Sequence, residues 1–323
     1  MKKEAGTAGE RPARPKLTQE HFTRVPDLDF PPDKIKEGME VMERQVVELA
    51  PALVDIARQA LKEKPQYIVC ADKSARIFGV PLCRFIERDL QAKIPPKDRY
   101  NPHLTFFNDD FIKDNIIKED KDGNLGVSIE PDMARRIAGA LAYVKGQRFF
   151  FIDEILALGR SLRSLLEEVK LANVGLDEKI NVHFFSLAQI DDPSHGGRID
   201  LAGNWKEFLA QTLSLARSTD NFEYTLCENH LQQDLFSHSP LFRYVITNNW
   251  RTKPINNLLV TLEEMRHTPE FGQQPEGVRK EFVRRTETMR QAIPQVMRSV
   301  SQAKKKLYQA MQQSYGRKTA ENN

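Results

Sequence analysis

The chain has 323 residues, of which 40% are hydrophobic and 29% charged, and its formal net charge is only +3. This composition is typical of a soluble globular protein, and the small net charge argues against a strong electrostatic field over the whole chain. No apolar run approaches the roughly 20 residues that span a bilayer, so we expect no membrane partner. The few, scattered cysteines (Cys70, Cys83 and Cys227) favour a cytoplasmic location without a disulfide framework.

The N-terminal sequence divides into a tail and a helical segment. Residues 1–30 combine glycine, proline and charge with little periodicity, so we expect a disordered tail. Over residues 31–64, apolar side chains recur at three- and four-residue steps, which predicts helices at 33–49 and 51–63. Pro51 separates the two helices, because proline fits the first turn of a new helix better than the interior of an old one.

Strand-like and helix-like stretches alternate after residue 65. Each expected strand is a short apolar run, and most are followed by an amphipathic stretch with helical spacing. This alternation is typical of βαβ units, and it predicts an α/β core with a parallel sheet over residues 65–250. The expected strands are 66–70, 103–107, 149–152 and 181–190, and the expected helices begin near residue 77 or span 131–144 and 160–171.

The pattern is weaker in two regions. Residues 108–130 are polar and contain glycine, so we expect a long, mobile loop there. After residue 200 we expect a helix at 205–216, and short strands at 222–226 and 242–247 that would be added to the sheet edge. Residues 251–323 are expected to form a basic, helical C-terminal region. Its expected helices are 258–266 and 278–313.

Two adjacent acids interrupt the pattern in the middle of the chain. Asp153 and Glu154 follow the apolar run 149–152, and a turn with Gly159 then leads into a helix. Open α/β sheets bind ligands where a strand ends and a helix begins. Two carboxylates and a helix N-terminus can together hold the hydroxyls and the phosphate of a sugar phosphate. The alternative is an ordinary helix start, at which the helix dipole favours acids.

The segment 149–162 resembles the phosphoribosyl-pyrophosphate motif of the type I phosphoribosyltransferases. That motif is a hydrophobic strand, two acids, an aliphatic pair, two small or hydroxyl residues, glycine, a variable residue and Ser/Thr. The resemblance implies that Asp153 and Glu154 hold the ribose 2′- and 3′-hydroxyls, and that the backbone at 157–161 and the Ser161 hydroxyl hold the 5′-phosphate. The implied binding set is Asp153, Glu154, Ala157, Leu158, Gly159, Arg160 and Ser161.

The chain departs from the family pattern at two of these positions. The family usually has threonine where this chain has Ala157, and threonine, alanine or another small residue where it has Leu158. The two substitutions remove a hydroxyl donor and add bulk beside the expected phosphate. They favour an alternative in which the protein keeps the fold but senses a nucleotide without catalysing a transfer.

A second stretch resembles the family loop that contacts pyrophosphate. It follows the strand expected at 66–70, and cations on each side of small residues suit a diphosphate. Its residues are Asp72, Lys73, Ser74, Ala75 and Arg76. The alternative is a solvated turn with ordinary surface charges. The polar loop 108–130 takes the place of the flexible loop that closes over the family's site, and its alternative is an insertion without that role.

The resemblance covers about residues 65–195 and implies a Rossmann-like, phosphoribosyltransferase-like core with helical N- and C-terminal additions. It implies binding of phosphoribosyl pyrophosphate or a related nucleotide with Mg²⁺, and transfer of phosphoribose to a nucleobase-like acceptor. The favoured enzyme class is therefore a glycosyltransferase. No catalytic residue and no protein ligand to a metal can be assigned from the sequence.

The C-terminal region carries many basic residues and few acids. Its apolar positions also form a stripe, so a solvated face on a docked or oligomerising helix is the favoured interpretation. Nucleic-acid binding is a third, less favoured function. The basic residues are Arg279, Lys280, Arg284, Arg285, Arg290, Arg298, Lys304, Lys305, Lys306, Arg317 and Lys318.

Overall fold

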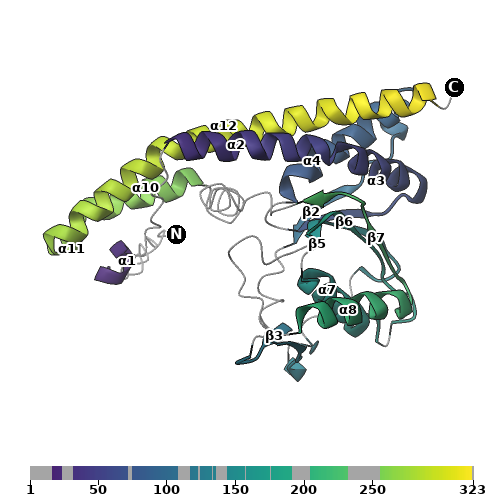
Figure 1. The fold of residues 1–323 in the computed structure, drawn as a ribbon, viewed down its shortest axis with the longest axis horizontal. Coiled ribbons are helices and arrows are strands. Elements are labelled where there is room, and N and C mark those ends of the chain that lie inside the picture. Colours follow the sequence, from purple (N-terminus) through teal and green to yellow (C-terminus); the bar gives the residue numbers. More distant parts are fainter. Residues whose placement is uncertain are drawn as a thin grey trace, which may run out of the picture.

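A parallel β-sheet forms the centre of the computed structural model (Figure 1). Its strand order is β2-β1-β5-β6-β7, with β8 paired to β6 beyond that path, and every pairing in it is parallel. The α/β fold predicted from the alternating pattern is therefore confirmed. The structure describes residues 17–23, 32–71, 75–107, 117–122, 124–132, 134–135, 144–156, 158–174, 176–190, 204–231 and 255–321.

The central strands are buried on both faces, as expected for a parallel sheet covered by helices. Phe150 and Phe151 point to opposite faces of β5, and only 0% and 3% of their surfaces are exposed. In register, Phe150 pairs with Ile68 of β1 and with His183 of β6. The strands are β1 (Tyr67–Ala71), β2 (His103–Phe107), β5 (Arg148–Leu156), β6 (Asn181–Ile190), β7 (Phe222–Leu226) and β8 (His230–Leu231).

Helices α3 (Ala50–Glu63) and α4 (Arg76–Phe85) cover one face of the sheet, and α4 continues into the π-helical turn η1 (Ile86–Leu90). Gly79 lets α4 approach the strands closely. A Cβ atom there would lie 2.8 Å from Cδ1 of Leu104 on β2 and 2.9 Å from Sγ of Cys70 on β1. A short 3-10 helix, η2 (Pro96–Asp98), precedes β2.

Helices α7 (Arg160–Asn173) and α8 (Trp205–Ser218) lie on the opposite face (Figure 1). The apolar side of α7 is buried, including Leu162 and Leu166, neither of which is exposed. From α8, Nε of Arg217 donates a hydrogen bond to the hydroxyl of Tyr224 on β7 at 2.8 Å. The two helices thus complete a three-layer arrangement of helix, sheet and helix.

The long C-terminal helix α12 (Glu276–Glu321) packs along α2 (Pro32–Glu48) and against α3 and α4. Near its C-terminal end, Nε2 of Gln312 donates to Oδ1 of Asp89 in η1 at 2.7 Å. Its N-terminal half packs with α1 (Gln19–Thr23) and α10 (Ile255–Arg266), and α11 (Pro269–Gly272) lies between α10 and α12 in the chain. The aromatic contacts there join Phe22, Phe271 and Phe282 at centroid separations of 5.4 to 5.8 Å.

Most expected elements appear with small shifts of their ends, but the expectation of an unstructured loop at 108–130 was wrong in part. Strands β3 (Ile117–Glu119) and β4 (Leu125–Val127) pair there as an antiparallel hairpin. A turn stabilises it, because a carboxylate oxygen of Asp120 accepts from the N–H groups of Asp122 and Asn124 at 2.9 Å. The disordered tail expected at 1–30 was wrong in part, because α1 forms within it and Phe22 of α1 is buried. Residues 1–16 and 24–30 of that tail, the expected strand 242–247 and most of the helix expected at 131–144 lie outside the described residues.

Among the helices that the structure describes, none is both long enough and apolar enough to cross a membrane. The proposed division into a tail, an N-terminal helical segment, a core and a C-terminal region stays a prediction.

Candidate ligand-binding site

The strand order reverses between β1 and β5. The strand that follows β1 in the chain, β2, lies on one side of it, whereas β5, β6 and β7 extend from the other side. The helix that follows β1, α4, packs on one face of the sheet, and the helix that follows β5, α7, lies on the opposite face (Figure 1). This is a topological switch point, and open α/β sheets bind ligands outside the carboxyl ends of the strands at such a point.

Both stretches predicted to bind ligand begin at this switch point. Cys70 of β1 and Ile152 of β5 are partners in register, one residue before Ala71 and Asp153 respectively. The predicted pyrophosphate loop starts directly after Ala71, and the predicted ribose-binding acids start at Asp153. The parallel pairing therefore brings the starts of these two stretches side by side, although about 80 residues separate them in the sequence.

The acids lie within β5 and not after it, because the strand runs on to Leu156. Asp153 pairs in register with Ser186 of β6, and only 6% of its surface is exposed. Alternation along the strand places Asp153 on the same face as Phe151. A carboxyl group this buried can hold a ligand hydroxyl with little competition from water. The side chain of Glu154 lies outside the part that the structure describes.

Gly159 makes the turn from β5 into α7. Its φ of 72° is in the left-handed region that favours glycine, and a Cβ atom there would lie 2.8 Å from Cδ1 of Leu209 on α8. The first helical hydrogen bond runs from the N–H of Arg163 to the carbonyl of Gly159 at 2.8 Å. The N–H groups of Ser161 and Leu162 come before it and make no bond within the helix, so they can donate hydrogen bonds to an anion.

Leu158, which the sequence motif places in the phosphate turn, packs into a hydrophobic cluster. It is only 9% exposed and packs in a small cluster with Ile117 and Leu125 of the hairpin and Phe208 of α8. The Leu158 side chain therefore makes hydrophobic contacts on the α8 side of the turn. Leu158 links the turn before α7 to the β3–β4 hairpin, a role that the sequence motif did not predict.

The side chain of Asn204, which precedes α8, binds the backbone of the same hairpin. Its Oδ1 accepts from the N–H of Leu125 at 2.7 Å, and its Nδ2 donates to the carbonyl of Leu125 at 3.3 Å. Sequence reasoning missed this residue, because 79 residues separate it from its partner. An asparagine before a helix signals only a cap, yet no side-chain capping bond to α8 is formed here.

The predicted pyrophosphate loop is described only at its C-terminal end. Ala75, which caps the start of α4, is fully buried. Asp72, Lys73 and Ser74 lie outside the described residues, as does the side chain of Arg76. Ala157 of the predicted phosphate turn also lies outside them, while Arg160 and Ser161 are half-buried. The contacts of this loop to a ligand stay a prediction.

A pocket of about 490 Å³ lies away from this site, at the C-terminal end of α7. Lys170 and Val174 of α7 and its following turn line it, together with Lys179 and Asn221. Lys179 and Asn221 come just before β6 and β7 begin, so the pocket lies toward the amino ends of those strands. Neither predicted stretch contributes a residue to it.

Several basic residues of α12 form ion pairs. Arg284 and Arg285 both contact Glu281 at 2.8 Å, and Arg290 contacts Glu263 of α10 at 2.6 Å. Arg284 and Arg285 hold the pKa of the Glu281 carboxyl at about 2 through hydrogen bonds and charge. Part of the positive charge seen in the sequence is therefore balanced within the structure, which supports the interpretation of a solvated, docked helix.

No protein-family model matches the chain, and no curated protein is significantly similar to it. Among solved structures, a purine phosphoribosyltransferase from Pyrococcus horikoshii is similar to it with 15% sequence identity and a TM-score of 0.27, over 58% of this chain and 87% of that one. A TM-score of this size does not establish a shared fold. The α/β assignment therefore stands on the strand order and register described above.

Proposed function

We propose that the carboxyl ends of β1 and β5 bind phosphoribosyl pyrophosphate or a related nucleotide together with Mg²⁺. The observation that carries the proposal is the strand order, which puts the starts of the two motif-bearing stretches next to each other at the switch point. The buried carboxyl group of Asp153 and the N–H groups of Ser161 and Leu162 at the start of α7 supply groups suited to a ribose and a phosphate.

Each part of the ligand has a complementary group in this arrangement. Asp153 and Glu154 accept hydrogen bonds from the ribose hydroxyls, and the start of α7 with the Ser161 hydroxyl binds the 5′-phosphate. The cations Lys73 and Arg76 are expected to bind the pyrophosphate. Mg²⁺ suits this site because carboxylate oxygens are the hard donors that it prefers, and when bound it neutralises charge on the diphosphate.

We propose that the reaction, where it occurs, is transfer of phosphoribose to a nucleobase-like acceptor. The bond between C1 of the ribose and the pyrophosphate oxygen breaks through an oxocarbenium-like state, and a bond from C1 to the acceptor forms. Cations beside the leaving pyrophosphate stabilise its growing charge. The protein's contribution is thus mainly to position the ribose and to balance charge.

Calorimetry with phosphoribosyl pyrophosphate and Mg²⁺ tests the binding step. We expect saturable binding to the wild type and a loss of about tenfold or more for Glu154→Gln and Ser161→Ala, because each loses a hydrogen bond to a charged or sugar group. Asp98→Asn, an exposed change in η2 at the other end of β2, is the matched control and should bind like the wild type. Absence of binding to the wild type would exclude this function.

A second candidate is a sensor that binds the nucleotide without transferring phosphoribose. The burial of Leu158 in the cluster with Phe208 favours it, because the turn gains a packing contact where the family pattern has a small or hydroxyl residue. Release of pyrophosphate distinguishes the two candidates. A sensor binds phosphoribosyl pyrophosphate but releases no pyrophosphate with any nucleobase, whereas turnover with one nucleobase excludes the sensor.

A further inference from the structure

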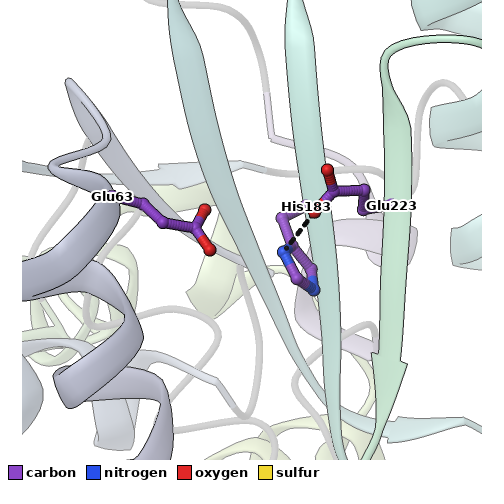
Figure 2. A group of neighbouring side chains, drawn as sticks. All are labelled: Glu63, His183 and Glu223. Carbon is purple, nitrogen blue, oxygen red and sulfur yellow. Dashed lines mark ion pairs between the residues drawn. The ribbon is translucent and has the colours of Figure 1, made fainter.

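A second group of polar side chains meets at the amino ends of the strands, the edge opposite the proposed nucleotide site. Glu63 ends α3, His183 is the third residue of β6, and Glu223 is the second residue of β7 (Figure 2). Each offers one ligand atom, and these three atoms lie within 4.8 Å of one another. We call these residues the amino-edge triad.

The other polar atoms of the triad have partners that orient two of its members. Nε2 of His183 lies 2.8 Å from the Thr225 hydroxyl, and Oε1 of Glu63 accepts from Nε2 of Gln59 at 2.8 Å. The imidazole also stacks on Phe185 with a centroid separation of 4.1 Å. Such outer contacts are typical of metal ligands, because they fix the direction of the coordinating atom.

Nδ1 of His183 and the remaining carboxylate oxygens of the triad lie close together at the amino ends of the strands. Nδ1 of His183 lies 3.1 Å from Oε2 of Glu223 and 3.2 Å from Nε2 of Gln59. Glu223 is 62% exposed, so the place is reachable from solvent.

A cation already bridges the two carboxylates of the triad. Nη2 of Arg148, the first residue of β5, lies 2.5 Å from Oε2 of Glu63 and 3.3 Å from Oε2 of Glu223. Its side chain is 36% exposed, so it can turn toward solvent without leaving a buried cavity. Two carboxylates held this close need a positive charge between them, and a metal ion can supply that charge as well as an arginine can.

We propose that Glu63, His183 and Glu223 bind a divalent transition-metal ion such as Zn²⁺, in a place that the Arg148 guanidinium takes when no metal is bound. One imidazole nitrogen and two carboxylate oxygens suit Zn²⁺, whereas Mg²⁺ prefers oxygen ligands alone. Ligands about 2 Å from a zinc ion lie about 3.3 Å apart. Nδ1 of His183 and Oε2 of Glu223 already lie 3.1 Å apart, close to this separation.

Such an ion would join α3, β6 and β7 at the edge of the sheet farthest from the proposed nucleotide. The proposal does not depend on that function, because the two sites share no residue. Its role is structural and not catalytic, since three side chains from three elements would be held by one centre.

Zinc titration by calorimetry, with chelator-treated protein, tests the proposal. We expect the wild type to bind one Zn²⁺ at the triad, and Glu223→Gln to weaken that binding by about tenfold or more. Because Glu223 is exposed, this variant is expected to fold. Glu228→Gln, an exposed change just after β7, is the matched control and should leave zinc binding unchanged. Equal zinc affinity in the wild type and Glu223→Gln would overturn the proposal.

Arg148→Gln tests the competition between arginine and metal. We expect it to bind Zn²⁺ about tenfold more tightly than the wild type, because the competing cation is gone while the ligands remain. Zinc should also raise its melting temperature by more than that of the wild type. Zinc binding by Arg148→Gln that is no tighter than wild-type binding would overturn the proposed displacement. Binding of phosphoribosyl pyrophosphate with Mg²⁺ should be the same in Glu223→Gln and the wild type, so the two sites can fail separately.

Discussion

The side chain of Asn204 binds both backbone polar groups of Leu125, its Oδ1 accepting from the N–H at 2.7 Å and its Nδ2 donating to the carbonyl at 3.3 Å. This pair of bonds fixes the β3–β4 hairpin to the start of α8. Two hairpin strands alone are marginally stable in water, so the hairpin needs such outside contacts.

Replacing Asn204 by alanine should therefore loosen the hairpin selectively. We expect amide hydrogen exchange over residues 117–127 to become faster by about fivefold, since a lost hydrogen bond costs about 1 kcal/mol. Gln211→Ala, which removes only an exposed contact to Glu207 within α8, should leave that exchange unchanged. Unchanged exchange in Asn204→Ala would show that the hairpin is held by other contacts.

Leu158→Ala should also destabilise the β3–β4 hairpin, here through the loss of hydrophobic packing. Removing a buried leucine costs about 2 to 5 kcal/mol, and the lower end applies here because the cluster is small. We expect a lower melting temperature and faster exchange over 117–127 together. Val174→Ala, at a side chain that is 78% exposed, is the control and should change stability by less than about 0.5 kcal/mol.

Two glycine-to-alanine substitutions in helices should change the free energy of unfolding in opposite directions. Gly316→Ala on α12 meets no atom within 4 Å and should stabilise the protein by about 0.5 to 1 kcal/mol, because alanine loses less entropy in a helix. Gly79→Ala would place a Cβ atom 2.8 Å from Leu104 and 2.9 Å from Cys70, so α4 must shift and stability should fall. Denaturant unfolding measures both, and a stabilising Gly79→Ala would contradict this packing.

The cysteines should react slowly in the folded protein. Burial, with the nearby charge of Glu87, raises the pKa of the Cys83 thiol to about 12, and burial with Asp55 raises that of Cys227 to about 11. At pH 8 the thiolate fraction of each should be lower than that of an ordinary cysteine by roughly a hundredfold or more. A disulfide reagent should therefore titrate these thiols rapidly only after denaturation. A rapid reaction of Cys83 or Cys227 in the native state would contradict the burial described.

The sequence predicted the elements of the sheet well where the strands are apolar and covered by helices. The strands at 181–190 and 222–226 appear with the predicted ends, because aromatic and β-branched residues dominate the first and alternate in the second. The β3–β4 hairpin was missed because each of its strands has only three residues, with Lys118 and Glu119 in the first and Gly126 in the second. It is held by Asn204 and by the cluster around Leu158, and no local pattern reveals these contacts.

The strand order could not be predicted from the sequence. Local pattern predicts that Asp153 ends an apolar strand, but only the pairing of Cys70 with Ile152 shows which earlier strand lies beside it. The amino-edge triad was missed for the same reason. Its members come from α3, β6 and β7, and a distance of 120 residues separates Glu63 from His183 in the chain. Contacts between residues this far apart in the chain produce no recognisable spacing pattern in the sequence.

The proposed function requires the carboxyl ends of β1 and β5 to bind one ligand together. Hydrogen exchange with and without phosphoribosyl pyrophosphate and Mg²⁺ tests this requirement, because backbone amides report each stretch separately. We predict slower exchange in two peptides at once, one covering 71–76 and one covering 157–162, with no change at 181–183 on the opposite edge. Unchanged exchange in both peptides, or a change at only one of them, would contradict a shared site.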